Sequence, residues 1–289
     1  MASEGDRRSD PEVERRSRLL GGLHFEGEGA RGVAIALLST AVFLTVVIVA
    51  VTQSAGWPEV KRTFFDWGDI SSSFPDIARA FVLNVKIFLV CEVFILVFAL
   101  VIAVLRSLPG PVFFPLRAFA IVYADLARGV PTILVIALLG FGAPALQLTG
   151  VPTSRVFWAG VGLILIYSGY VAEVYRAGIE SVHPSQEAAA RSLGLSRFQA
   201  LRRVILPQAI RRVIPPLLND FIGLQKDTAL VALLGVVEAF RQSQIESAAA
   251  FNYTPYLATA LLFLLLTIPL TRFTDWLIAR NRRRELARA

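Results

Sequence analysis

Residues 33–51 read VAIALLSTAVFLTVVIVAV, a run of 19 residues without a charge. At 1.5 Å of rise per residue, a helix over this run matches the hydrocarbon core of a bilayer, which is ~30 Å thick. The chain as a whole has 289 residues, of which 55% are apolar and 18% are charged. A soluble protein has about 25% charged residues. The sequence therefore predicts an α-helical membrane protein.

Five further apolar segments follow the first one along the chain. Turn-forming sequences such as 106–111 and 150–152 separate them. The predicted spans are 33–51, 77–105, 113–146, 156–177, 213–237 and 255–278. The third span contains Gly129 and Pro131, and the fifth contains two prolines and several charges, so we expect both to be interrupted helices. The predicted fold class is an all-α membrane protein with about six transmembrane helices.

The basic residues indicate the orientation of these spans. With six spans, 21 Lys and Arg residues fall on the side of both termini and of the stretch 178–212, and four fall on the opposite side. The positive-inside rule then places both termini and this stretch in the cytoplasm. Residues 1–32 are expected to be a cytoplasmic tail, and residues 279–289 a basic cytoplasmic tail.

Composition excludes several kinds of site. One cysteine and two histidines cannot form an internal disulfide or a thiolate metal cluster, so we expect no metal site. The three lysines, Lys61, Lys86 and Lys226, are followed by Arg, Ile and Asp, so no P-loop is present. No group of His, Asp and Ser residues has a catalytic pattern. We therefore expect that the chain is not an enzyme and binds no cofactor. The arginines lie in blocks between apolar runs, which does not indicate a nucleic-acid partner.

The stretch 184–196, PSQEAAARSLGLS, carries the most specific pattern in the chain. It predicts a short helix that starts at Pro184, a left-handed stop at Gly194, and a second helix capped by Ser196. The second helix is expected to end at Leu206-Pro207. A DNA-binding helix-turn-helix has a similar pattern, and a loop helix without a partner is a third interpretation. A loop of ~30 residues between two membrane spans is too small for a core of its own, which disfavours the DNA-binding alternative.

Several segments together carry a family resemblance. Glu187, Ala188 and Ala189, then Gly194, then Leu206 and Pro207 resemble the EAA loop of ABC-importer permease subunits. Residues 127–132, ARGVPT, are similar to the Arg-Gly-Thr-Pro segment of the polar amino-acid permeases, with Val130 in place of threonine. The resemblance covers residues 78–278, with the loop at 181–207. The helix at 33–51 lies outside the usual five-helix core of that family and resembles an N-terminal addition.

This resemblance implies a permease subunit of an ATP-driven importer in the cytoplasmic membrane of a prokaryote. The expected substrate is a polar amino acid, such as glutamate, glutamine or a basic one. The expected partners are two cytoplasmic ATPase subunits that bind the loop and use the ATP, a second permease, identical or related, an extracytoplasmic binding protein, and membrane lipid. The alternative is a channel or secondary transporter that acts alone.

Four charged residues inside the predicted spans are candidates for the substrate pathway: Arg128, Glu173, Lys226 and Asp227. A charge at the centre of a bilayer costs at least ~2.5–3.5 kcal/mol, so such residues need partners or a wet cavity. Arg128 is three residues from Asp125, and Glu173 three from Arg176, so both could instead form local ion pairs. Lys226 and Asp227 point in different directions from one helix, so at least one should meet another element.

Overall fold

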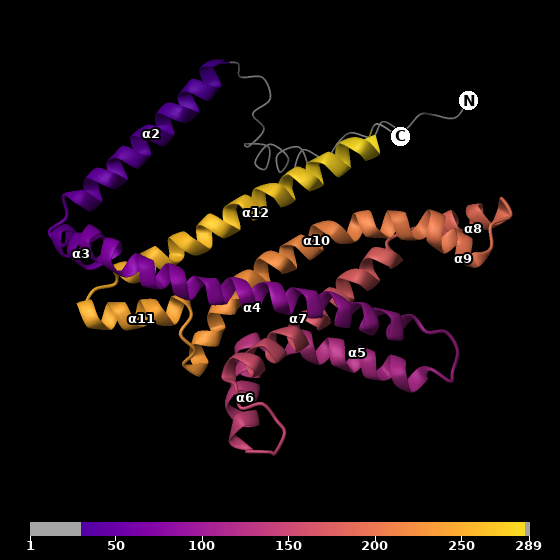
Figure 1. The fold of residues 1–289 in the computed structure, drawn as a ribbon. Helices are drawn as coiled ribbons and strands as arrows, with labels where there is room; N and C mark the ends of the chain where they lie inside the picture. Colours follow the sequence, from indigo (N-terminus) through magenta and orange to yellow (C-terminus); the bar gives the residue numbers. More distant parts are fainter. Residues whose placement is uncertain (1–29, 287–289) are drawn as a thin grey trace, which may run out of the picture. The chain divides into compact units, whose positions relative to one another are not determined.

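A computed structural model describes residues 30–286 of the chain (Figure 1). The chain divides into two units, residues 1–60 and residues 61–289. In the first unit, helix α2 covers Ala30–Thr52. The short helix α3, Trp57–Phe64, crosses the boundary between the units. The predicted span 33–51 is therefore a helix, while most of the predicted tail at 1–32 lies outside the described residues.

The second unit consists of helices only, as far as the structure describes it. In chain order they are α4 (Trp67–Ser107), α5 (Phe114–Gly129), α6 (Thr132–Ala145), α7 (Arg155–Glu180), α8 (Pro184–Ser192), α9 (Arg197–Ala200), the π-helix η1 (Leu201–Ile205), α10 (Leu206–Asp227), the 3₁₀-helix η2 (Thr228–Leu234), α11 (Ala239–Ala250) and α12 (Thr254–Leu286). Part of the predicted C-terminal tail, residues 279–286, thus belongs to α12.

Helix α7 is the centre of this unit (Figure 1). It packs against α4, α5, α6 and α10, and the core between them is apolar. Ile95 of α4, Leu163 of α7 and Leu224 of α10 are fully buried in it. Gly169 of α7 brings α5 close, because a Cβ atom there would lie 2.4 Å from the Cβ of Ala127.

The two expected interruptions are present. Helices α5 and α6 meet at an angle of 101°, with Val130 and Pro131 between them, where proline cannot continue the backbone hydrogen-bond ladder. Helix α10 contains Pro215 and Pro216 and passes into the tighter η2 after Asp227. The first break lies at the predicted Gly129 and Pro131, whereas α10 continues through both prolines and changes only after Asp227.

Judged by the length and composition of the described helices, fewer spans are present than the six predicted. Four of the described helices are long and apolar enough to cross a membrane, or five if α5 and α6 together form one span. The predicted span at 213–237 does not pass this test, because α10 carries Arg211, Arg212, Asp220, Lys226 and Asp227. The count of six stays a prediction.

One predicted helix end is wrong. The helix capped by Ser196 does not stop at Leu206-Pro207; the backbone continues through η1 directly into α10. Pro207 lies in the first turn of α10, where its missing N–H is tolerated. The wider π-helical turn accommodates the proline, because the N–H of Leu206 bonds to the carbonyl of Leu201, five residues back.

Candidate coupling loop and membrane charges

The loop between α7 and α10 has the predicted two-helix form. Pro184 opens α8, and the ring of His183 accepts a hydrogen bond from the N–H of Ser185 at 3.2 Å. Gly194 follows α8 with a φ of 86°, in the left-handed region that a side chain disfavours. The hydroxyl of Ser196 and the side chain of Gln199 form a capping box at the start of α9, at 3.3 and 2.9 Å. The Gly194 stop and the Ser196 cap are confirmed.

The surface of this loop includes exposed apolar side chains. Ala188 and Ala189 are exposed, and Glu187 beside them is half-buried. Two large side chains that belong to no core project nearby: Leu193 is 84% exposed and Phe198 is 69% exposed. Small residues next to protruding apolar ones form a surface suited to contact with another protein.

The six predicted coupling residues lie on α8, in the turn after α8 and at the start of α10. Leu206 and Pro207 are exposed at the start of α10, after η1. The side chain of Gln208 reaches Gln186 of α8 at 3.5 Å, so this end of α10 lies beside α8. Arg212 donates a hydrogen bond to the carbonyl of Ser181, just after α7. The loop is therefore attached at both ends to helices that enter the core.

Glu173 of α7 joins charged residues from three helices. Its carboxylate accepts a hydrogen bond from Arg106 at the end of α4, at 2.8 Å, and pairs with Arg176 on its own helix. Arg128 of α5 lies 3.9 Å away and also pairs with Asp125 at 2.7 Å. Both local pairs expected from the sequence are present. Sequence patterns did not predict the contact of Glu173 with Arg106, because the two residues are 67 positions apart along the chain.

The contacts of Lys226 and Asp227 differ from those of Glu173. Asp227 accepts a hydrogen bond from the hydroxyl of Tyr167 on α7 at 2.9 Å, so it does meet another element. Lys226 is exposed. Of the four predicted pathway residues, Arg128 and Glu173 thus lie together, Asp227 instead bonds to Tyr167, and exposed Lys226 belongs to neither group.

Sequence reasoning did not select two further carboxylates. Glu92 of α4 and Asp220 of α10 lie within electrostatic range of each other. One oxygen of Asp220 is buried without a hydrogen-bond partner among the described residues. A buried oxygen without a hydrogen bond raises the free energy of the fold. A cation or a hydrogen-bond donor bound at this position would therefore be stabilising. The signal was present in the sequence, since Glu92 is the one charge in the run 87–105 and Asp220 lies inside a predicted span.

Another buried carboxylate stabilises the fold. Glu238, which caps α11, is fully buried and accepts hydrogen bonds from Asn84 at 2.8 Å and from the N–H groups of Phe240 and Arg241. Burial raises the pKa of Glu238, and these three hydrogen bonds oppose the increase. Among the described residues, no group of three His, Cys, Asp or Glu side chains could hold a metal ion.

Long apolar helices around a central helix, with an exposed two-helix loop on one side, define a helical membrane protein. Residues 96–283 match the model of the family described as binding-protein-dependent transport system inner membrane component. The chain belongs to this family.

Named relatives and solved structures agree with this assignment. The chain is 36% identical over 204 residues to the probable amino-acid permease protein YxeN of Bacillus subtilis (strain 168), which covers 70% of this chain and 90% of that protein. It is also 36% identical over 188 residues to the probable glutamine ABC transporter permease protein GlnM of the same organism, covering 64% of this chain and 83% of that one. A crystal structure of an amino acid ABC transporter with histidines matches with a TM-score of 0.68 and 28% identity, over 74% of this chain and 98% of that one.

Proposed function

We propose that this chain is the permease subunit of an ATP-driven importer that carries a polar amino acid, glutamate, glutamine or a basic one, across the cytoplasmic membrane of a prokaryote. Two cytoplasmic ATPase subunits bind the coupling loop and use the ATP. A second permease, identical or related, completes the pathway, and an extracytoplasmic binding protein delivers the substrate. The printed names of the relatives, which include amino-acid and glutamine permeases, support this substrate class.

One observation carries the proposal: an exposed loop with apolar projections is fixed to two helices of the core. Leu193 and Phe198 offer a contact surface, and the bond between Arg212 and the carbonyl of Ser181 ties α10 to the end of α7. A partner that pushes on the loop therefore moves both helices. A channel or secondary transporter that acts alone needs no such surface.

The charged groups in the membrane support a zwitterionic or charged cargo. Arg128 could bind the carboxylate of a substrate, and Glu173 and Asp227 could bind its ammonium group. Lys226 is exposed and remains a candidate for the pathway. The Asp220 oxygen that accepts no hydrogen bond from the described part of the chain offers a further acceptor for a cationic group. A path for sugars would instead rely on neutral hydroxyl and amide groups.

The test uses the φ of Gly194. A valine at a φ of 86° costs about 1–2 kcal/mol locally, whereas asparagine tolerates this region. Within residues 30–286, no neighbouring atom lies within 4 Å of a Cβ at this position, so the effect is confined to the turn of the loop. We expect Gly194→Val to insert normally and to lose ATPase binding or substrate-stimulated hydrolysis in the purified complex.

Gly194→Asn is the matched control and should retain coupling. If the valine variant keeps the wild-type number of ATPase subunits and wild-type stimulation, the loop is not the coupling contact. Uptake by the chain in vesicles without any ATPase would support the alternative of a transporter that acts alone.

A further inference from the structure

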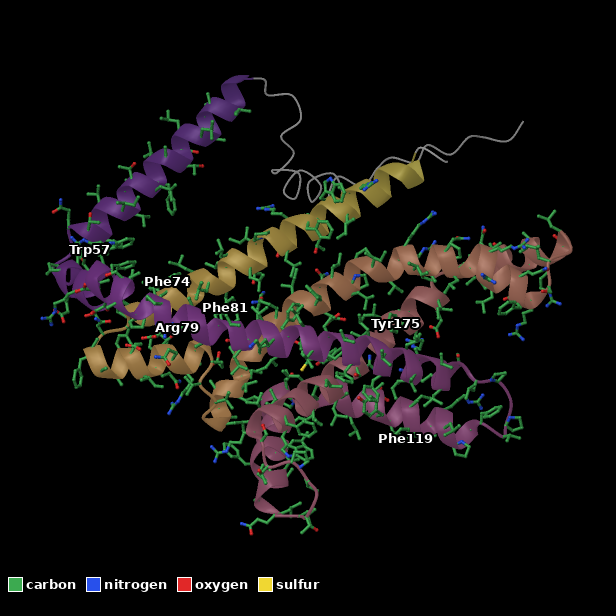
Figure 2. The ribbon with its side chains drawn as sticks, viewed as in Figure 1. Trp57, Phe74, Arg79, Phe81, Phe119 and Tyr175 are labelled. Atoms are coloured by element: carbon green, nitrogen blue, oxygen red, sulfur yellow. The ribbon has the colours of Figure 1, made fainter. Side chains whose placement is uncertain are left out.

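An apolar groove runs along α4 and α7 of the second unit. It consists of two adjoining hollows of about 380 and 390 Å³. Both are lined by Phe94 of α4 and by Phe157, Val161 and Ile164 of α7. Phe119 of α5, labelled in Figure 2, closes one hollow. The walls are almost entirely hydrocarbon.

This groove faces away from the polar interior. Phe94 and Phe98 are about half-exposed, at 49% and 51%. Glu92, two residues before Phe94 and so on the opposite side of α4, lies toward Asp220 of α10. In a membrane protein, an open apolar groove on the outer side of a spanning helix is in contact with lipid.

Lys86 lines the end of the second hollow. It is exposed, and within the part of the chain that the structure describes, no carboxylate forms an ion pair with it. The 18 residues after Lys86 contain only one charged residue, Glu92. Lys86 therefore lies at the border of the apolar part of α4, where a lysine extends its ammonium group to the headgroup region.

The geometry points to a binding site for one anionic phospholipid, whose acyl chain fills the groove and whose phosphate pairs with Lys86. The distance along α4 from Lys86 to Phe98 is 12 residues, or ~18 Å, close to the ~15 Å depth of one hydrocarbon leaflet. Five aromatic rings line the groove that such a chain would fill, and the ammonium group supplies the preference for a negative headgroup. With the predicted topology, this is the leaflet opposite the coupling loop.

The test compares two phospholipids that differ in headgroup charge. The full-length chain is purified in detergent, and the retention of dioleoyl phosphatidylglycerol and dioleoyl phosphatidylcholine is measured by native mass spectrometry. A single lysine near the surface accounts for about a fivefold preference for the anionic lipid. We expect this preference in the wild type and in Lys86→Arg, and its loss in Lys86→Met.

Two further variants separate the groove from general charge. Val161→Trp fills the space shared by the two hollows and should reduce retention of both lipids, while Val161→Ala leaves the groove open and should not. Lys61→Met removes a lysine of α3, outside the groove, and should keep the preference.

Three results would overturn the proposal. The first is equal retention of both lipids by the wild type, which also results if a helix of this or another chain occupies the groove. The second is an unchanged preference in Lys86→Met. The third is unchanged retention in a Val161→Trp chain that elutes as a single species at the wild-type volume.

Discussion

The contact between Gly169 and Ala127 sets how closely α5 approaches α7. A Cβ atom at position 169 would lie 2.4 Å from the Cβ of Ala127 and 3.7 Å from the Cα of Ala124. Two carbon atoms normally approach to ~3.5–4.0 Å, so Gly169→Ala must separate the helices by about 1 Å or more. Ala127 has no flexible side chain that could move aside.

The magnitude follows from two opposing effects. Overpacking of a core costs about 1–3 kcal/mol, whereas alanine in place of glycine in a helix gains about 0.8–1.0 kcal/mol. Gly160 provides the matched control on the same helix, because a Cβ there would lie 3.6 Å from the sulfur of Cys91, an ordinary contact. The two variants gain the same helix propensity, so their difference in stability isolates the strain at Gly169.

The assay is thermal unfolding in detergent, followed by loss of the monodisperse peak at one fixed heating schedule. For a chain of this size, 1 kcal/mol shifts Tm by about 2–4 °C, so a strain of ~2 kcal/mol puts Gly169→Ala about 4–8 °C below Gly160→Ala. The double variant Ala127→Gly with Gly169→Ala removes the clash and should recover about half of this difference, because glycine at position 127 costs α5 about 0.8–1.0 kcal/mol. Equal Tm values for the two single variants would refute the close contact.

Two other predictions concern orientation and the pathway. Reporter fusions after Ala289 and within residues 185–200 should both report the cytoplasm, and an extracytoplasmic signal at either point would overturn the charge-based topology. Arg128→Ala should reduce uptake by the assembled complex with little change in its amount in the membrane, whereas Arg79→Ala, which removes another i,i+3 pair with an aspartate, should leave uptake unchanged. Loss of the protein in Arg128→Ala, or normal uptake, would remove Arg128 from the pathway.

Local features of this fold were predictable where one residue type determines the backbone. Gly194 predicts the left-handed turn, Ser196 the cap of α9, and the Gly129-Pro131 segment the break between α5 and α6. The angle of 101° at that break was not predictable, because it depends on how α6 packs against α7. The π-helix at Leu201–Ile205 was missed, because a proline two residues after it predicted an end and not a wider turn.

Sequence patterns did not predict the contacts between helices that are far apart along the chain. The pair of Glu173 with Arg176 is three residues apart and was predictable, but the bond from Arg106 depends on α4 lying against α7. The same holds for the bond between Tyr167 and Asp227, which joins α7 to α10. A single sequence shows which buried charges need partners, and the packing of the helices decides which partners they find.

Helices α7 and α10 connect the candidate coupling loop to both groups of charges. The loop lies between their ends, α7 carries Glu173 and Tyr167, and α10 carries Asp220 and Asp227. A shift of α7 relative to α4 and α5 would change the distances from Glu173 to Arg106 and Arg128, and a shift relative to α10 would break the bond between Tyr167 and Asp227. Packed helices prefer discrete arrangements to continuous deformation, so these contacts are suited to distinguish two states of the pathway. Coupling in the proposed importer then requires that ATP, through the loop, and the substrate, through these side chains, bias the same movement of α7 and α10.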